Sequence, residues 1–324
     1  MKNFSLAEPR TVEQVTAFLS ERREKSFLLA GGTDLLGEIK DEIIEPEVVV
    51  DLKSIPNLSH IRKEKDGVHI GAMTALAELV ENPLIKNDYP GLHEAAKSVA
   101  TPQLRNMGTV GGNLCQRPRC WYYRDPQVKC RKKGGSKCFA FRGRNKYHAI
   151  FGGGPCYIVH PSDLAPALIS LDAKITIVAP KGEKTIPLAD FYVLPRVNVR
   201  QENILNLDEV VREIRIPYSR SGEKSTYYKL KERGAWDFAL LSAAVKGVVS
   251  GGVFRDIRIV LGGVAPVPWR LEKAENMIRG KVATEELLRQ AAREALKEAR
   301  TLKDNGYKKD LLEVVLSRAA LSLV

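Results

Sequence analysis

A basic segment in the middle of the chain is the feature that most constrains its fold. Between Cys115 and His148 the sequence holds eleven lysine and arginine residues and one acidic residue, Asp125. The basic residues are Arg117, Arg119, Arg124, Lys129, Arg131, Lys132, Lys133, Lys137, Arg142, Arg144 and Lys146. This segment accounts for most of the formal net charge of +12, so the rest of the chain is nearly neutral. We therefore expect a globular body that carries one specialised basic segment, without the extended basic face of a nucleic-acid-binding protein.

Cysteines coincide with this basic segment. Cys120, Cys130, Cys138 and Cys156 are separated by nine, seven and seventeen residues, and Cys115 lies just before them. Structural zinc sites usually contain a C-x₂₋₄-C pair, and ferredoxins have short spacings of their own; neither pattern occurs here. The spacing leaves three interpretations open: unrelated thiols, disulfides, or a 4Fe–4S cluster whose negative charge the basic residues would stabilise.

Length and composition exclude several classes of protein. With 324 residues, of which 44% are hydrophobic, the chain is long enough for two or three domains and too apolar to be disordered. No segment approaches the roughly 18 uninterrupted apolar residues of a membrane span. The N-terminal residues lack the apolar stretch of a secretory signal, and five cysteines are too few for a disulfide scaffold.

The hydrophobic pattern predicts mixed α and β structure. Apolar residues at helical spacing predict helices over 11–25, 74–80, 92–100, 164–171, 284–296 and 311–316. Short apolar or alternating runs predict strands at 27–30, 48–50, 68–71, 174–179, 210–217, 225–231, 238–249 and 257–262. The regular βα units of a doubly wound sheet are not seen. A polar turn at 219–222 predicts a domain boundary.

Two glycine-rich stretches are candidates for cofactor binding. In the first, residues 29–34 (LAGGTD), consecutive glycines after an apolar run can direct backbone amides at a phosphate. The second, residues 108–113 (GTVGGN), adds hydroxyl and amide side chains that can bond a ligand. Each alone is most often a simple turn. Two such loops, neither matching G-x-G-x-x-G nor the P-loop, favour a dinucleotide held by a fold other than the Rossmann fold.

Two smaller features have ordinary structural interpretations. Ser162-Asp163 is placed to cap the helix predicted over 164–171. Lys229 reads as a surface lysine on a strand, and the five histidines show no metal-ligand spacing. By themselves, these residues indicate no chemistry.

Taken together, the motifs resemble the FAD-binding (medium) subunit of the molybdenum hydroxylase, or xanthine dehydrogenase, family over nearly the whole chain. The matching motifs are AGGTDLL (30–36), QLRNMGTVGGNL (103–114), HPSDLAPAL (160–168), KLKERGAWDFAL (229–240) and VLGGVAPVPWR (260–270). The resemblance implies an α+β fold with a two-part FAD-binding domain of the vanillyl-alcohol-oxidase (PCMH) type over 1–219, interrupted by the Cys-bearing insert at about 115–157. A C-terminal domain of small antiparallel sheet and helices would span 220–324.

The resemblance also implies roles for individual residues. The FAD diphosphate would be wrapped by Leu29, Ala30, Gly31, Gly32, Thr33, Asp34 and Leu35, with the amides of Gly31, Gly32 and Thr33 as donors. The diphosphate and ribityl region would be held by Thr109, Gly112 and Asn113. Asp163 would contact the adenosine side of FAD or neighbouring backbone, and Lys229 would approach the isoalloxazine ring. Cys115 would pack near FAD without binding metal.

The insert is similar to that of the flavin subunit of bacterial periplasmic aldehyde oxidoreductases, which carries an extra 4Fe–4S cluster. This similarity implies that Cys120, Cys130, Cys138 and Cys156 are the cluster ligands. The flavin subunit of 4-hydroxybenzoyl-CoA reductase has a comparable insert with different spacing, so a complex of that type, or one of the xanthine dehydrogenase type, is the alternative.

The function implied is that of an electron-transfer subunit of an oxidoreductase, with no catalytic residue of its own. A molybdenum-cofactor large subunit would oxidise the substrate, and we expect this reaction to convert an aldehyde to a carboxylic acid. A 2Fe–2S small subunit would pass the electrons to FAD. An external acceptor such as ferredoxin would then receive them. We expect a cytoplasmic protein, with periplasmic export alongside a signal-bearing partner as the alternative. A zinc-stabilised nucleic-acid-binding protein is the competing hypothesis from another class.

Overall fold

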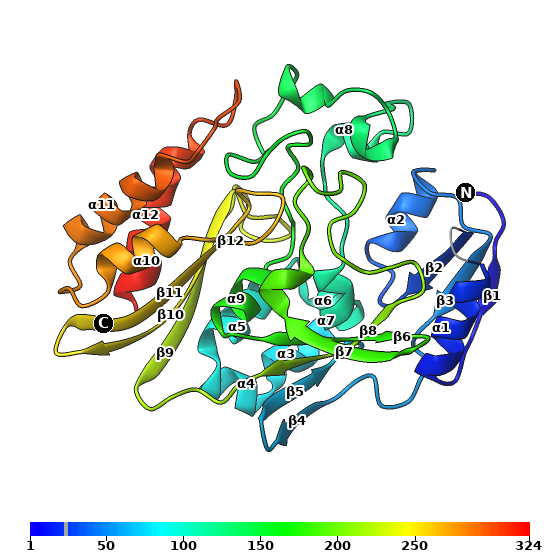
Figure 1. Ribbon diagram of the computed structural model, residues 1–324, viewed down its shortest axis with the longest axis horizontal. Coiled ribbons are helices and arrows are strands. Elements are labelled where there is room, and N and C mark those ends of the chain that lie inside the picture. The colour runs from blue at the N-terminus through cyan, green and yellow to red at the C-terminus, as the bar shows by residue number, and fades with distance from the viewer. Residues whose placement is uncertain (23–24) are drawn as a thin grey trace.

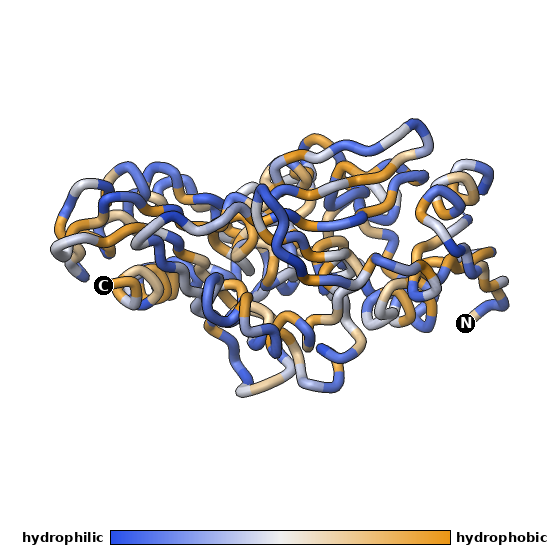
Figure 2. The backbone as a smooth tube through the Cα atoms, turned by 90° about the horizontal axis from the view of Figure 1, so that it is seen from below, coloured by the Kyte–Doolittle hydropathy of each residue, from blue (hydrophilic) through white to orange (hydrophobic). Residues whose placement is uncertain are grey.

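The computed structural model describes residues 1–22 and 25–324 and contains three β-sheets (Figure 1). The N-terminal sheet lies on the right of this view, the central sheet below the middle and the C-terminal sheet on the left. The two termini lie toward opposite ends of the long axis (Figure 2). The first helix, α1, spans Val12–Glu21, and the last residues of the helix predicted over 11–25 include 23 and 24, which lie outside the described residues.

The first sheet has three parallel strands in the order β1-β3-β2. Their bounds are Ser5–Ala7 for β1, Ser26–Leu29 for β2 and Val48–Asp51 for β3. Val15 and Leu19 of α1 share a buried cluster with Val48 and Val50 of β3, so α1 covers one face of this sheet. The helix α2, Leu35–Lys40, begins shortly after β2 ends. The first glycine-rich stretch therefore joins the end of a parallel strand to the start of a helix.

The central sheet has five antiparallel strands in the order β4-β5-β8-β6-β7. The strands are Ile61–Glu64 (β4), Gly67–Gly71 (β5), Lys174–Ala179 (β6), Gly182–Pro187 (β7) and Val210–Ile216 (β8). The chain leaves this sheet after β5 and returns at β6. One long connection between β5 and β6 therefore contains the second glycine-rich stretch and the insert. We call this connection the excursion.

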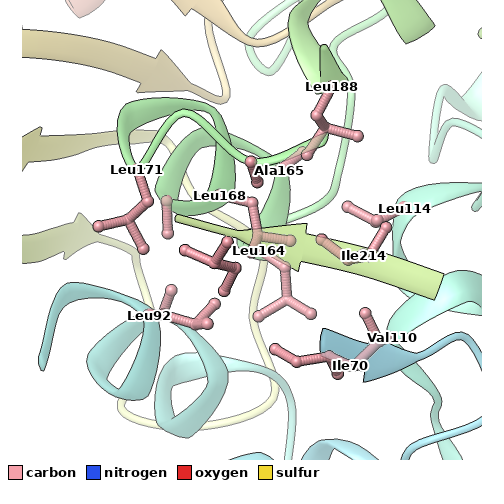
Figure 3. Close-up of a cluster of buried hydrophobic side chains, with 14 of the residues drawn as sticks. Ile70, Leu92, Val110, Leu114, Leu164, Ala165, Leu168, Leu171, Leu188 and Ile214 are labelled. Atoms are coloured by element: carbon pink, nitrogen blue, oxygen red, sulfur yellow. The ribbon is translucent and has the colours of Figure 1, made fainter. Parts of the chain in front are cut away.

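Helices of this excursion build the main core. They are Leu76–Glu81 (α3), Pro83–Asp88 (α4), Pro90–Ser98 (α5), Pro102–Met107 (α6), Val110–Leu114 (α7), Trp121–Arg124 (α8) and Leu164–Ser170 (α9). Figure 3 shows Leu92 of α5 and Leu164 and Leu168 of α9 against Ile70 and Ile214 of the sheet, all of them buried. This packing fixes α7 and the start of α9, which both carry predicted site residues.

Residues 101–114 form the two short helices α6 and α7, and the glycine-rich stretch 108–113, which the sequence analysis treated as a loop, is largely helical. The side chain of Thr101 accepts a hydrogen bond from the first turn of α6, and Thr109 does the same for α7. Glycine in a helix costs about 1 kcal/mol relative to alanine, and here the Thr109 cap and the burial of α7 offset that cost.

The insert contains little regular structure and lies at the top of the molecule in Figure 1. Besides α8 it has two single 3₁₀ turns, Arg131–Lys133 (η2) and Phe139–Phe141 (η3). Backbone hydrogen bonds close its loops locally, as between the amide of Gly135 and the carbonyl oxygen of Cys130, 2.9 Å apart. Its shape therefore depends on turns and side-chain contacts rather than on a sheet.

The C-terminal part is an antiparallel sheet in the order β12-β11-β10-β9, covered by three helices. The elements are Glu223–Leu230 (β9), Leu241–Ser250 (β10), Val253–Gly262 (β11), Trp269–Arg270 (β12), Glu272–Ile278 (α10), Glu285–Leu296 (α11) and Lys308–Leu321 (α12). The hydroxyl of Thr284 accepts a hydrogen bond from Leu287 at 3.2 Å, which confirms the predicted cap of α11. The strand expected over 238–249 begins only at Leu241, because the preceding residues form a loop beside the cavities described below.

No helix among the described residues is long and apolar enough to cross a membrane. The colours in Figure 2 change between hydrophobic and hydrophilic over short stretches along the whole tube.

Candidate functional site

A cavity of about 620 Å³ lies between the first glycine-rich stretch, α6 and α7, and the start of the insert. Most of the predicted FAD-binding residues line it: Ala30, Gly31, Gly32, Thr33, Asp34, Leu35, Thr109, Gly112, Asn113 and Asp163. Two predicted FAD-binding residues, Leu29 and Lys229, do not line the cavity. Leu29 is the last residue of β2, and Lys229 lies on β9. The fold thus gathers motifs that are far apart in the sequence around one space, which we call the flavin cavity.

Gly31 sets how closely the two glycine-rich stretches approach each other. A Cβ atom on Gly31 would lie 1.9 Å from the carbonyl oxygen of Met107, at the end of α6. Any larger residue would therefore push the stretches apart. Gly32 follows with φ +73°, in the left-handed region that glycine adopts freely. In the described part of the chain the backbone amides from Gly31 to Asp34 donate to no other group, so they are available to an anionic ligand.

The helix α7 presents two polar side chains to the same cavity. The hydroxyl oxygen of Thr109 accepts the amide of Gly112 at 3.1 Å and keeps its hydrogen for another acceptor. The side-chain oxygen of Asn113 accepts the hydroxyl of Ser162 at 2.5 Å, so its amide nitrogen is the group left for a ligand. The Ser162 oxygen accepts the amide of Ala165 at 3.0 Å. The cap predicted at Ser162-Asp163 is therefore made by Ser162, which also orients Asn113.

Asp163 lines the flavin cavity and is held there by two residues of β9. The ammonium group of Lys229 lies 2.7 Å from one carboxylate oxygen, and the Tyr227 hydroxyl donates to the other at 2.6 Å. The Lys229 and Asp163 side chains are 3% and 6% exposed, which excludes the interpretation of Lys229 as a surface lysine. Burial, with the Asp163 carboxylate, holds the pKa of Tyr227 well above its usual value, so its hydroxyl remains a donor. Lys229 positions Asp163, and its approach to the isoalloxazine ring stays a prediction.

Asp34, the last residue of the first motif, fastens the insert to the wall of the flavin cavity. Its carboxylate accepts the backbone amide of Arg117 at 2.6 Å and the guanidinium of Arg124 at 2.6 Å. The guanidinium of Arg119 lies 3.0 Å from it and also covers the ring of Phe238. These contacts neutralise a carboxylate that would otherwise repel a diphosphate nearby. A direct contact between the Asp34 side chain and FAD stays a prediction.

Further buried ionic contacts hold the insert in place. Lys132 and Arg117 both pair with Glu202, and the side chains of Lys132 and Glu202 are 1% and 2% exposed. The hydroxyl of Tyr123 donates to Glu38 at 2.6 Å, and burial raises the pKa of that carboxyl group. Much of the basic charge noted in the sequence is therefore internal, and acidic residues from distant parts of the chain neutralise it.

The remaining basic residues of the insert form a separate surface set. Six have no carboxylate partner in the described part of the chain: Lys129, Arg131, Lys133, Lys137, Arg142 and Arg144. Exposed aromatic side chains lie in the same segment, with Trp121 47% and Phe141 50% exposed. We call these six residues the surface cations. No carboxylate among the described residues neutralises them, although Arg131 and Lys133 donate to the carbonyl oxygens of Ser136 and Asp125, so their positive charge is available to an external partner.

Four of the five cysteines interact with one another inside the insert. The interaction with Cys156 lowers the pKa of Cys138. Cys120 interacts electrostatically with Cys130 and Cys138, and burial raises the pKa of Cys120 to about 11. The Nε2 atom of His148 lies 3.2 Å from the Cys120 sulfur. The fold therefore brings the four predicted cluster ligands into one neighbourhood.

Cys115 lies apart from these four residues, in the lining of the flavin cavity. Burial raises the pKa of its thiol to about 12. All five cysteines are free thiols, so the disulfide interpretation is not realised in this structure. Within residues 1–22 and 25–324, no group of three or more His, Cys, Asp or Glu side chains is arranged to hold a metal ion. The four cysteines thus gather without forming the compact ligand set of a mononuclear site such as structural zinc.

A buried lysine joins the end of the insert to the C-terminal part. Lys308, on α12, is 0% exposed, and its ammonium group donates to the carbonyl oxygens of Tyr147 and His148 at 3.1 Å and of Gly263 at 2.6 Å. The side-chain amide of Asn305 donates to the His148 carbonyl oxygen as well, at 3.1 Å. Burial lowers the pKa of Lys308 to about 7. The position at which the chain leaves the insert is therefore fixed mainly by contacts to backbone.

Sequence analysis missed three residues that position the site: Tyr227, Ser162 as a partner of Asn113, and Glu202. Tyr227 could have been found, because it stands two residues before Lys229 on a strand and therefore shares its face. Glu202 lies outside regular helices and strands, and no local pattern connects it with Arg117 or Lys132.

The chemistry of the flavin cavity fits FAD. Free backbone amides at a strand–helix junction suit a diphosphate, and the Thr109 hydroxyl and Asn113 amide supply donors to sugar or ribityl oxygens. A volume of about 620 Å³ lies within the range of cofactor sites, roughly 300–1,000 Å³. The cavity is therefore preformed for a dinucleotide, by backbone rather than by a Rossmann motif.

Comparison with protein families gives two matches that together span nearly the whole chain. Residues 2–219 match the FAD binding domain in molybdopterin dehydrogenase. Residues 226–323 match the CO dehydrogenase flavoprotein C-terminal domain.

Curated relatives and solved structures agree with these matches. The aldehyde oxidoreductase FAD-binding subunit PaoB of Escherichia coli (strain K12) is 35% identical over 282 residues, which cover 86% of each chain. The carbon monoxide dehydrogenase medium chain of Hydrogenophaga pseudoflava is 32% identical over 294 residues, 90% of this chain and 86% of that one. A solved structure of carbon monoxide dehydrogenase from the same organism superimposes with a TM-score of 0.78 at 29% identity, covering 99% and 98% of the two chains.

Proposed function

Since this chain belongs to the family of FAD-binding subunits of molybdenum hydroxylases, we propose that it is the electron-transfer subunit of an aldehyde-oxidising complex and carries a 4Fe–4S cluster beside its FAD. A molybdenum-cofactor large subunit and a 2Fe–2S small subunit would complete the complex. FAD supplies the exchange between two-electron and one-electron transfer when bound. The residues of this chain bind and orient it.

The preformed flavin cavity carries this proposal. Its free amides lie where Gly31 allows two segments to approach to van der Waals contact, so little rearrangement is needed when FAD binds. Asn113 is already oriented by Ser162, and Asp163 by Lys229 and Tyr227. Both Asn113 and Asp163 are thus fixed in direction by other residues.

The gathering of four thiols supports the 4Fe–4S cluster. All ligands of one metal ion must reach a single centre, whereas each thiolate of a 4Fe–4S cluster binds a different iron, so the sulfur atoms stand farther apart. Cys120 interacts electrostatically with Cys130 and Cys138, and Cys138 interacts with Cys156, so the four thiols are near enough to one another to serve one cluster. Lys132 acts electrostatically on Cys156, and positive charge of this kind stabilises a cluster with net negative charge.

The surface cations support a protein electron acceptor. Unpaired basic groups on the outside of the segment that holds the thiols complement an acidic one-electron carrier such as ferredoxin. Electrostatic docking of this kind weakens as ionic strength rises. Replacing Lys129, Lys133 and Lys137 with Gln should lower the rate of ferredoxin reduction at low salt and leave the rate at high salt nearly unchanged. An equal rate at all salt concentrations would remove this part of the proposal.

Purification of the chain with its partner subunits tests the function directly. We expect one FAD and four irons on this subunit, in addition to the iron of the small subunit, and bleaching of the flavin band on addition of an aldehyde. Purines and 4-hydroxybenzoyl-CoA are the controls. Bleaching by a purine alone would assign the complex to the xanthine dehydrogenase type. Reoxidation of the previously reduced flavin by 4-hydroxybenzoyl-CoA, which takes up two electrons and two protons and loses its hydroxyl group as water, would assign it to the 4-hydroxybenzoyl-CoA reductase type. We propose the cytoplasm as its compartment, with export by a signal-bearing partner as the alternative that cell fractionation would reveal.

A further inference from the structure

The side chain of His148 lies against one of the four predicted cluster ligands. Its Nε2 atom is 3.2 Å from the sulfur of Cys120, and the residue is 4% exposed. The sequence analysis assigned no role to His148, and the residue does not line the flavin cavity. The contact therefore belongs to the cysteine-bearing segment and needs an explanation there.

The backbone of His148 is fixed by contacts that do not involve its ring. Its amide donates to the carbonyl oxygen of Asn145 at 3.0 Å. Its carbonyl oxygen accepts the ammonium group of Lys308 and the side-chain amide of Asn305, each at 3.1 Å. The ring is therefore directed toward Cys120 by a main chain that is held independently of it. Another ring can replace the imidazole without breaking these hydrogen bonds.

The two ring nitrogens of His148 have different surroundings. Nε2 faces the Cys120 sulfur, whereas Nδ1 is buried and makes no hydrogen bond in the described part of the chain. A thiolate that binds iron carries no hydrogen, so it can only accept a hydrogen bond. A hydrogen on Nε2 satisfies this sulfur, while a lone pair on Nε2 would face the lone pairs of the thiolate. When Cys120 is a thiolate, the ring therefore carries its hydrogen on Nε2.

His148 and Cys120 compete for one position at the cluster, because each iron of a 4Fe–4S cluster takes one protein ligand. Cys130, Cys138 and Cys156 supply the other three positions as thiolates. Cys120 interacts electrostatically with Cys130 and Cys138, so its sulfur belongs to the same group of thiols. The fourth position therefore goes to Cys120, and the ring of His148 remains as a donor to that ligand.

Cys120 is also the predicted ligand that lies toward the flavin cavity. Together with His148 it lines a smaller cavity of about 330 Å³. The walls of this smaller cavity include Arg119 and Phe238, which line the flavin cavity as well. The other three cysteines line neither cavity. A hydrogen bond to the Cys120 sulfur would therefore act on the side of the cluster that faces the flavin.

We propose that His148 donates a hydrogen bond from Nε2 to the Cys120 thiolate and thereby raises the reduction potential of the 4Fe–4S cluster. The inference rests on the proposed function, since it requires the cluster. Reduction adds one electron, which comes from the reduced flavin, so negative charge on the ligand sulfurs increases. A donor at one of these sulfurs stabilises the reduced form more than the oxidised form. The hydrogen stays on Nε2 in both states. His148 thus acts through Cys120 and binds no metal itself.

A redox titration of the purified complex, followed by the EPR signal of the reduced 4Fe–4S cluster, is the first test. His148→Phe keeps a ring and the backbone contacts to Lys308 and Asn305, but its ring cannot donate. We expect the ratio of reduced to oxidised cluster at a given potential to fall about tenfold, which equals about 59 mV for one electron. His93→Phe is the matched control, because His93 lies on α5 and lines neither cavity, and it should titrate like the wild type. Equal midpoint potentials in His148→Phe and the wild type would overturn the inference.

Isotope labelling tests the hydrogen bond in the wild type. In a complex produced with ¹⁵N-histidine, pulsed EPR of the reduced cluster should show a weak nitrogen coupling that His93→Phe keeps and His148→Phe loses. No coupling in the wild type would overturn the inference, and so would the strong coupling of a nitrogen bound to iron, because His148 would then be a ligand. This measurement decides the question even where His148→Phe does not assemble its cluster. A wild-type complex without the additional iron would instead count against the proposed function, on which the inference rests.

Discussion

The flavin cavity and the insert beside it are built by different means. The cavity is formed by main chain: a strand end, two capped short helices, and amides brought close because residue 31 has no side chain. The insert has almost no regular structure and is held by buried ion pairs, an aromatic hydroxyl and turns. The flavin cavity and the proposed cluster site therefore depend on different interactions.

This difference has a consequence for how each site responds to change. A backbone site is fixed by the packing of its helices and sheet, so it is organised before any cofactor arrives. A site made of thiols on an irregular segment gains much of its order when the metal cluster binds, because binding energy and folding energy are then the same quantity. We therefore expect damage to the insert to disturb the flavin cavity less than loss of the proposed cluster would disturb the insert.

The largest expected effect is the loss of the cluster in Cys130→Ala. Cys130 is buried and its removal takes away one of four thiols, so we expect the additional iron and sulfide to be absent while most of the FAD is retained. Iron, sulfide and flavin analysis of the purified complex measures this. Cys115→Ser is the matched control, since Cys115 lines the flavin cavity instead, and it should keep full iron. Equal iron loss in both variants would contradict the assignment of ligands.

Gly31→Ala should affect FAD binding in the flavin cavity, whereas Cys130→Ala affects the iron content of the insert. The added methyl group would overlap the Met107 carbonyl oxygen, and relieving such an overlap costs roughly 3 kcal/mol, so FAD affinity should fall about 100-fold. The flavin-to-protein ratio after gel filtration reports it. Gly37→Ala, a position in α2 with no atom within 4 Å of the new Cβ, should retain FAD. If both variants bind FAD normally, the close approach of the two segments is unimportant.

Lys132→Met should loosen the insert without emptying the flavin cavity. Breaking a buried pair usually costs about 3–5 kcal/mol, but Arg117 still compensates Glu202, so we expect about 2 kcal/mol. Thermal unfolding and proteolysis within the insert would measure it. Lys129→Met, which removes an exposed lysine that has no carboxylate partner, should change stability by less than about 0.5 kcal/mol. Similar losses in both would mean that the buried pair contributes little.

The smallest effect is a pH dependence at the border of the two regions. Burial lowers the folded-state pKa of His160 to about 3, whereas an unfolded histidine titrates near 6.5. The unfolded chain therefore binds the extra proton first, and stability is full above pH 6.5 and declines as the pH falls toward 3. We expect a loss of about 1 kcal/mol between pH 6.5 and 5.5 in denaturant unfolding. In His160→Gln the free energy of unfolding should depend less on pH. An unchanged dependence would mean that another group causes it.

The sequence predicted regular elements well where a strong hydrophobic pattern marks them. The strand at Lys174–Ala179 and the helices around 164–171 and 285–296 agree with expectation to within a residue or so. Short elements with weak patterns were missed, among them β1, β4, β7 and α10. Such elements form because their neighbours provide the pairing or the buried face, and that information is not local.

For the candidate site, the sequence motifs identified residues that line the flavin cavity and missed most of the residues that hold them in position. Gly31, Thr109, Asn113 and Asp163 were predicted, and all four line the flavin cavity. The ion pairs of Asp34 with Arg119 and Arg124 could not be predicted, because the partners meet only through the long excursion between β5 and β6. The basic charge of the insert was also read as one property, whereas the structure divides it into a buried set and a surface set.

Lys308 has a consequence for how this protein tolerates variation. Its three acceptors are carbonyl oxygens, so substitutions of the Tyr147 or His148 side chains leave the hydrogen bonds of Lys308 intact. Deleting the last helix, however, would free the far end of the insert although the two regions are remote in the sequence. A frameshift or nonsense change that removes α12 would therefore disturb the insert as well as the C-terminal core, to which α12 contributes Leu312, Val315 and Leu316.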